Sequence, residues 1–302
     1  MKDKSPLGSF SKNINSQWGE DGIIDEIFNR IGVTNKICFE FGAWDGFHYS
    51  NTCNLWNKKG WSAILIEGDA AKTEELKKNT SSFKDVQAIN QYVESEGPNS
   101  LNNIFIKLKL PYSIDLLSID IDGDDIYTLE CLKDFKPRVI IIEYNPTIPL
   151  SLDIKQEKGN FFGSSALAIL KVAKTKGYKL THMTDTNIFL VTSEEFSKLG
   201  FNEPLLEDIF PDTYITYAFS SYDGQIVLSN TPVYRDSIAH IKEISVLSLV
   251  KSIFKIILKK KIFHYFQKPN EKDVNHQKVV KNKKSELTNN HSHFCISLLI
   301  VV

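Results

Sequence analysis

The chain has 302 residues, of which 42% are hydrophobic and 24% are charged, and its formal net charge is -1. This composition is ordinary for a globular protein and excludes a chain that is disordered throughout. Because the charge is close to neutral, it gives no general attraction to nucleic acid, and we expect no nucleic-acid partner.

From residue 17 onward, helical and strand patterns alternate. Apolar residues recur at helical spacing over 17–31, with Glu20, Asp21 and Asp25 near the start, where a helix dipole favours anions. Strands are expected at 36–42, 62–67, 85–90, 115–121 and 138–144, and helices between them at 48–58, 71–79, 99–107 and 125–134. The alternation predicts βαβ units, a mostly parallel sheet and right-handed crossovers.

The pattern ends with a helix and a hairpin. A helix is predicted from Ser164 to Lys176, and Gly177 is placed to end it. Two apolar runs follow, at 178–183 and 188–192, and the short gap between them predicts an antiparallel hairpin. Beyond residue 198 the alternation stops, and short β-like segments at 214–219 and 225–228 flank Asp223-Gly224, itself a hairpin signal.

We therefore divide the chain into four parts. These are an N-terminal helical segment (1–35), an α/β core (36–198), an accessory lobe (199–244) and a C-terminal extension (245–302). Residues 245–266 combine a broad apolar face with lysines, which suits a helix on an anionic membrane surface or one packed on the protein's own body. Residues 269–293 are polar and without periodicity, and disorder is expected there.

The cysteines and the absence of long apolar runs bear on location. Cys38, Cys53, Cys131 and Cys295 show no C-x-x-C spacing, so free thiols in a reducing compartment are expected rather than disulfides or zinc. Met1–Pro6 lacks a signal-like apolar segment, and no stretch reaches the ~18 apolar residues of a membrane span. The expected location is cytoplasmic, with peripheral contact at the inner face of the membrane through 245–266 left open.

Acidic residues and glycines follow three of the predicted strands. The segments are Phe39–Gly46, Ala63–Asp69 and Leu116–Asp124, and each is an apolar run that stops abruptly. Runs of this kind are typical of strands buried on both faces of a parallel sheet, and ligands bind beyond the carboxyl ends of such strands. A nucleotide-like ligand with hydroxyls and a positive charge is the leading interpretation.

The first turn contains Gly42 and Gly46, whose missing side chains let backbone amides approach a ligand closely. Trp44 stands where a dinucleotide fingerprint has its second glycine, which disfavours NAD. The alternative is that the glycines only form a tight βα turn.

Glu67 ends the second strand about twenty residues after this turn, where an acid accepts hydrogen bonds from ribose hydroxyls in Rossmann-like sites. Its alternative role is a cap or an ion pair with Lys72, although Asp69 suits the N-cap better. Asn90, at the end of the third strand, can both donate and accept, as recognition of an adenine edge requires.

The fourth and fifth strands add further acids. Asp120, Asp122 and Asp124 alternate after the fourth strand, and they either bind a cation or face one that belongs to a cofactor. A calcium loop of the EF-hand type is disfavoured because its twelfth position is Cys131. Glu143 closes the fifth strand at the same edge, with a buried acid paired to a basic residue as the alternative.

Taken together, these motifs resemble the FkbM-type family of S-adenosylmethionine-dependent methyltransferases over residues 16–196. The motifs are Ser16–Asp21, Glu40–Gly46, Ser50-Asn51-Thr52, Ile119–Gly123 and Gly177-Tyr178. The resemblance implies a Rossmann-like methyltransferase fold with a C-terminal antiparallel hairpin. It also implies that Glu40, Gly42 and Gly46 lie along the methionine and ribose end of the cofactor, Glu67 on the ribose, and Asp120 and Asp122 at the mouth of the active site. The predicted cofactor-binding residues are Glu40, Gly42, Ala43, Gly46, Glu67, Asn90 and Asp120. Two departures are Gly68 in place of a proline and Asp122 in place of a glutamate.

By this resemblance, the expected activity is methyl transfer from S-adenosylmethionine to a hydroxyl of a carbohydrate or related polar product. A hydroxyl acceptor must lose its proton, for which Asp122, Asp124 and His48 are the catalytic candidates. No metal is assigned. The alternatives are a nucleotide-sugar glycosyltransferase that holds a divalent metal on Asp120 and Asp122, and a non-catalytic module that binds a membrane or partner through 245–266.

Overall fold

The computed structural model of the chain describes residues 5–234 and 237–238, and it divides into two compact units. The first unit extends to Tyr217 and the second begins at Ala218, so the predicted accessory lobe (199–244) includes parts of both. The predicted helix at 245–266, the predicted disordered stretch and Cys295 lie outside the described residues. In the described ranges, no helix combines the length and apolar character that crossing a bilayer requires.

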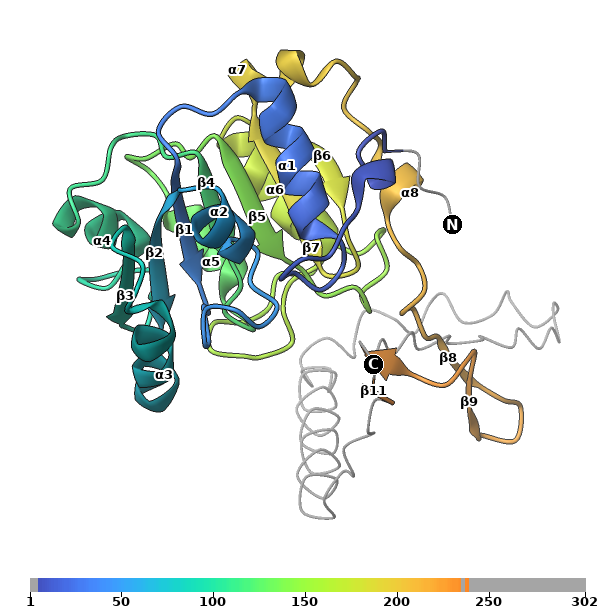
Figure 1. Ribbon diagram of the computed structural model, residues 1–302. Coiled ribbons are helices and arrows are strands. Elements are labelled where there is room, and N and C mark those ends of the chain that lie inside the picture. Colours follow the sequence, from blue (N-terminus) through green and yellow to red (C-terminus); the bar gives the residue numbers. More distant parts are fainter. Residues whose placement is uncertain (1–4, 235–236, 239–302) are drawn as a thin grey trace, which may run out of the picture. The chain divides into compact units, whose positions relative to one another are not determined.

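The first unit is built on a seven-stranded sheet with the strand order β3-β2-β1-β4-β5-β7-β6 (Figure 1). The strands are β1 (Ile37–Phe41), β2 (Ser62–Glu67), β3 (Val86–Asn90), β4 (Leu116–Ile119), β5 (Val139–Glu143), β6 (Tyr178–Met183) and β7 (Asn187–Thr192). The first five pair in parallel, whereas β7 runs antiparallel to both β5 and β6. This is the doubly wound, Rossmann-like arrangement with a C-terminal hairpin that the sequence predicts.

Helices cover both faces of the sheet. They are α1 (Glu20–Ile31), α2 (Cys53–Lys58), α3 (Ala70–Thr80), α4 (Leu101–Lys107), α5 (Asp125–Cys131) and α6 (Ala166–Thr175). Shorter elements are η1 (Gly8–Phe10), α7 (Ser193–Phe196), η2 (Ser197–Leu199) and α8 (Leu206–Ile209). One hydrophobic cluster joins the sheet to α4, α5 and α6, and a second joins it to α1, α2 and α3. Successive β1 residues alternate between the clusters, with Cys38 in one and Phe39 in the other, because strand side chains alternate between faces.

One helix begins later than predicted. The sequence pattern predicts a helix over 48–58, but α2 begins at Cys53. The preceding residues are held by the Glu40 carboxylate, which accepts hydrogen bonds from the Asn51 N–H and the Ser50 and Thr52 hydroxyls. Tyr49 also has a positive φ of 55°, which a right-handed helix does not allow.

The second unit contains two short antiparallel pairs, β8 (Ala218–Ser220) with β9 (Ile226–Leu228) and β10 (Val233–Tyr234) with β11 (Ser237–Ile238). Gly224 has a φ of 84° in the turn between β8 and β9. The hairpin predicted around Asp223-Gly224 is therefore confirmed.

Candidate active site

The turn after β1 is tightly packed against the turn after β4. Gly42 has a φ of 65°, and a Cβ placed on it would come within 1.9 Å of the Asp120 carbonyl oxygen. Gly46, with a φ of 86°, packs against the Leu76 side chain, which a Cβ would meet at 2.8 Å. A Cβ would be strained by the positive φ at both positions, and at Gly42 it would also clash with backbone, whereas the Leu76 side chain at Gly46 can shift. Gly42 therefore lets the ends of the neighbouring strands β1 and β4 meet, and Gly46 lets the turn pack on α3.

Glu67 connects the turns after β1 and β2. Its carboxylate accepts hydrogen bonds from the Trp44 N–H at 3.0 Å and the Asp69 N–H at 2.8 Å. The Lys72 ammonium lies 5.0 Å from the centroid of the Trp44 ring, and Asp69 caps α3 by accepting from the Lys72 N–H at 2.9 Å. Glu67 is buried, yet each carboxylate oxygen has a second lone pair for a ligand hydroxyl.

Glu40 lies within the protein and is held by neutral donors. The Ser50 and Thr52 hydroxyls donate to one oxygen at 2.7 and 2.6 Å, and the Asn51 N–H donates to the other at 2.8 Å. Burial raises the pKa of Glu40 to about 7. The three hydrogen bonds lower this pKa by less than burial raises it, and the nearby Asp120 charge adds a smaller rise. Its observed contacts fix the segment before α2. Ala43, also buried, donates its N–H to the Ile66 carbonyl at 3.1 Å and joins the β1 turn to β2.

Asn90 directs its side-chain nitrogen toward the turn after β2. It donates to the Glu67 and Gly68 carbonyls at 3.0 and 3.1 Å and to the Thr73 hydroxyl at 2.8 Å. The ring of Tyr92, a residue that the sequence reasoning missed, packs over Gly68, where a Cβ would come within 2.5 Å of it. The absence of a side chain at Gly68 therefore makes room for an exposed aromatic ring beside Glu67 and Asn90.

Asp120, Asp122 and Glu143 form an acidic group at the ends of β4 and β5. One carboxylate oxygen from each lies within 4.8 Å of those of the other two. Glu143 is buried, Asp120 is half-buried, and Asp122 is exposed with a positive φ of 56°. Carboxylates this close would attract a cation, either a divalent metal or a positively charged cofactor.

Asp125, which the sequence reasoning missed, holds the turn that carries two of these acids. One carboxylate oxygen accepts from the Ile121 N–H and the other from the Gly123 N–H, both at 2.9 Å. Burial, and to a lesser degree the Asp120 charge, raise the pKa of Asp125 to about 7. The available signal was an aspartate at the first residue of a helix directly after a glycine turn, where such side chains often accept backbone N–H groups.

Asp124 and His48 lie in different surroundings from the acidic group. The Asp124 carboxylate accepts from the Gln156 side-chain amide at 2.8 Å and the Gly159 N–H at 3.1 Å, and so it fixes the segment after β5. The His48 ring is exposed and lies 5.0 Å from Trp44 and 3.9 Å from Tyr49, centroid to centroid. Its backbone N–H donates to Asp45 at 2.7 Å, so it belongs to the turn and not to a helix start.

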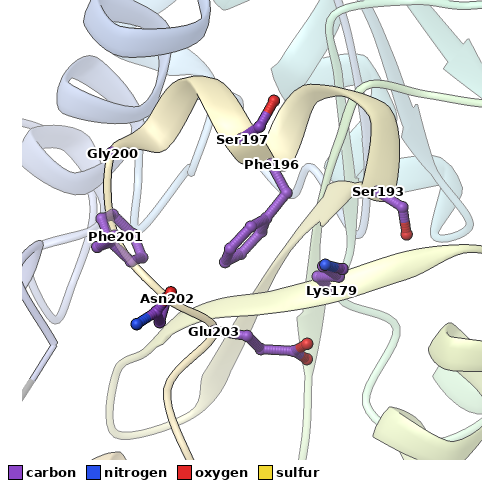
Figure 2. A pocket seen from close by; sticks show the side chains of 8 residues that line it. All are labelled: Lys179, Ser193, Phe196, Ser197, Gly200, Phe201, Asn202 and Glu203. Carbon is purple, nitrogen blue, oxygen red and sulfur yellow. The ribbon is translucent and has the colours of Figure 1, made fainter.

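A cavity of about 520 Å³ lies at the opposite edge of the sheet (Figure 2). It is lined by Lys179, Ser193, Phe196, Ser197, Gly200, Phe201, Asn202 and Glu203. Lys179 is the second residue of β6 and Ser193 follows the antiparallel β7, which places the cavity at the end where the parallel strands begin. None of the acids described above lines it, so the candidate site is defined by the strand ends instead.

Comparison with solved structures finds methyltransferases of low sequence identity and low TM-score. No family model matches the chain, and no curated protein matches it. A SAM-dependent methyltransferase from Aquifex aeolicus is 12% identical over 55% of this chain and 87% of that one, with a TM-score of 0.35. An O-methyltransferase from Bacillus cereus in complex with SAH is 16% identical over 56% and 78%, with a TM-score of 0.39. The chain covers 65% of M. capricolum TrmK at 16% identity, with a TM-score of 0.35.

Proposed function

We propose that the chain is an S-adenosylmethionine-dependent methyltransferase that acts on a hydroxyl of a carbohydrate or related polar product. The observation that carries the proposal is a hydrogen bond that links the turn after β1 to the end of β2. The Trp44 N–H in the glycine turn after β1 donates to the Glu67 carboxylate at the end of β2. The backbone of the glycine turn therefore lies next to a carboxylate that can accept hydrogen bonds from ribose hydroxyls.

The residues present fit the cofactor chemically. Gly42 and Gly46 permit the tight turn along which the methionine end would lie, and Glu67 retains acceptor capacity for ribose hydroxyls. Asn90, with Tyr92 nearby, would meet the adenine through its side-chain oxygen, because its N–H groups are directed to Glu67, Gly68 and Thr73. The acids of the β4 turn favour a sulfonium cation through their negative charge. When bound, the cofactor would supply an electrophilic methyl group.

The protein's own part is to hold the acceptor hydroxyl and take its proton. Asp122 is the best-placed base, because it is exposed and belongs to the acidic group at the strand ends. Asp124 acts indirectly, since its carboxylate is already engaged by Gln156 and Gly159. His48 is an alternative base on the neighbouring turn. Positioning accounts for much of the rate in such a transfer.

Calorimetric titration with S-adenosylmethionine and S-adenosylhomocysteine tests the proposal. We expect metal-independent binding that weakens at least about tenfold in Glu67→Gln, because the amide loses part of the carboxylate's acceptor capacity. Glu74→Gln is the matched control, since Glu74 lies on the exposed face of α3 and pairs with Lys77. Absence of binding to either compound by the folded protein would rule out the assignment.

A second candidate function is favoured by the acidic group. Oxygen ligands from Asp120, Asp122 and Glu143 within 4.8 Å of one another would suit a divalent cation on the diphosphate of a nucleotide sugar. The same calorimetry distinguishes the two functions. Binding of a UDP-sugar that requires manganese and is lost in Asp122→Asn would favour a glycosyltransferase, whereas nucleoside binding without metal would favour the methyltransferase.

A further inference from the structure

Two neighbouring phenylalanines are exposed on the connection between β5 and α6. Phe161 is 86% exposed and Phe162 is 46% exposed. They lie between Gly159 and Gly163, which have φ values of 79° and 70°. We call residues 159–163 the aromatic loop. Scattered apolar residues are common on protein surfaces, but two adjacent aromatic rings on a functional edge indicate a binding surface.

The aromatic loop is held in place by buried and partly buried polar groups. The Gln156 side chain, which is 1% exposed, donates to the Asn160 carbonyl at 2.9 Å and accepts from the Gly163 N–H at 2.8 Å. Asp124 accepts from the Gly159 N–H at 3.1 Å and from Gln156 at 2.8 Å. These hydrogen bonds hold the loop in one conformation. The rings are therefore exposed on an ordered segment.

The aromatic loop also contacts the ends of both strands that carry the acidic group. The Asn160 carbonyl packs so closely on Gly123 that a Cβ there would come within 2.5 Å of it. On the other side, Gly163 packs on Asn145, whose side-chain amide donates to the Phe162 carbonyl. Gly123 directly follows Asp122, and Asn145 lies two residues after Glu143. The loop that carries the phenylalanines thus packs on residues next to the carboxylates in the chain.

We propose that Phe161 and Phe162 are specificity-determining residues that bind a sugar ring of the acceptor, an inference that rests on the function proposed above. A sugar ring has C–H faces and a rim of hydroxyls. The C–H groups suit the electron-rich face of an aromatic ring, and a rim hydroxyl suits the exposed Asp122 carboxylate. An aliphatic acceptor could not form hydrogen bonds with the acids, and a small ionic acceptor has no apolar surface to pack on two phenylalanines.

Saturation-transfer NMR on the full chain, with and without S-adenosylhomocysteine, tests this with the methyl glycosides of glucose, galactose, mannose and rhamnose as probes. We expect transfer to the ring C–H protons of at least one glycoside. The affinity should fall at least about fivefold in Phe161→Ala and recover in Phe161→Tyr, which restores an aromatic face. Tyr112→Ala is the matched control, because Tyr112 is 64% exposed but precedes β4 at the opposite edge of the sheet.

The outcomes separate this inference from the proposed function. If S-adenosylhomocysteine binds but no glycoside does, or if Phe161→Ala binds glycosides like the wild type, the sugar-binding role is wrong. Binding of decanoate in place of glycosides, lost in Phe161→Ala, would also overturn it in favour of an apolar acceptor. If S-adenosylhomocysteine fails to bind while glycoside binding depends on Phe161, the methyltransferase assignment fails and the sugar site remains.

Discussion

At the scale of single residues, acids that look alike in the sequence have different surroundings. Glu40 and Asp125 are buried and accept hydrogen bonds from neighbouring backbone or hydroxyl groups, whereas Asp122 is exposed. Asp124 holds a loop through Gln156. For Asp124 the distinction depends on a contact with Gln156, 32 positions away, which local spacing does not encode, whereas the Asp125 contacts are two and four residues away.

Gly42 provides a residue-scale prediction with a close control. Gly42→Ala and Gly60→Ala impose the same backbone strain, because their φ values are 65° and 67°. Only the Gly42 substitution also forces the new Cβ against the Asp120 carbonyl, since nothing lies within 4 Å of a Cβ on Gly60. We expect Gly60→Ala to lower the free energy of unfolding by about 1 kcal/mol and Gly42→Ala by about 3 kcal/mol.

Urea unfolding of the two variants measures this difference, and calorimetry with S-adenosylhomocysteine measures its effect on the site. Gly42→Ala should also weaken cofactor binding, because it moves the β4 turn. Equal stability losses in the two variants would mean that the contact between the strand ends is unimportant for stability.

Asp125 provides a second residue-scale prediction. Asp125→Ala leaves the partly buried Ile121 N–H and the buried Gly123 N–H without their acceptor, which should lower the free energy of unfolding by about 2–4 kcal/mol. Asp125→Asn keeps one acceptor oxygen and should lose about half as much. Asp153→Ala, at an exposed ion pair with Lys171, is the control and should change stability by less than about 1 kcal/mol. Thermal or urea unfolding decides, and equal values for Asp125→Ala and Asp153→Ala would contradict the turn-holding role.

At the scale of elements, the strands and most helices followed from the sequence because their signals are local. The five parallel strands are apolar runs ended by polar residues, and each falls within one or two residues of its predicted start, as β2 (Ser62–Glu67) does at 62–67. The start of α2 could not be predicted in this way. It depends on Glu40, ten residues before Ser50, capturing the segment that would otherwise form the first helical turn.

The elements at the opposite edge of the sheet are joined by a buried ionic network. Arg138, just before β5, pairs with the fully buried Asp115 at 2.7 Å and with Glu195 in α7 at 3.0 Å. Its guanidinium also donates to the carbonyls of Ile31 and Gly32 at the end of α1. A single side chain thus connects α1, the start of β5 and α7.

Loss of this network is predicted to be costly. Arg138→Ala leaves the Asp115 charge buried without its cationic partner and should lower the free energy of unfolding by about 3–5 kcal/mol. Lys171→Ala removes an exposed pair with Asp153 and should cost less than about 1 kcal/mol. Urea titrations of both variants measure the difference. A loss below about 1 kcal/mol for Arg138→Ala would show that the three N–H donors from 34–36 satisfy Asp115 by themselves.

At the scale of the whole molecule, charges are paired at one edge of the sheet, whereas acids lie together at the other. The edge where the strands begin pairs Asp115 with Arg138. The edge where they end gathers Glu40, Asp120 and Asp125. Burial raises the pKa of Glu40 and Asp125, and negative charge at Asp120 adds to the rise in both, least at Glu40. An accumulation of acids that opposes its own ionisation is unfavourable for folding alone, and a cationic ligand would relieve it.

The stability of the folded chain should therefore fall as the pH rises from about 4.5 to about 7. Burial raises the pKa of Glu40 and Asp125 to about 7, above the values of the unfolded chain, so the folded state holds more protons in this window. Their contribution is complete below the unfolded pKa and is lost as the pH passes the folded pKa. Glu96, Glu194 and Glu195 have lowered pKa values, and their opposite effect lies at lower pH.

Urea unfolding at half-unit steps from pH 5 to pH 8 measures this slope, and Glu40→Gln tests its origin. The wild type should lose a few kcal/mol across the window, at about 1.4 kcal/mol per pH unit for each extra proton held by the folded state. Glu40→Gln carries no titrating group at that position, so its slope should be about half as steep. Glu74→Gln, on the exposed surface of α3, should keep the wild-type slope. An unchanged slope in Glu40→Gln would show that the Glu40 carboxylate does not cause the loss of stability with rising pH. Asp125 would then be its source.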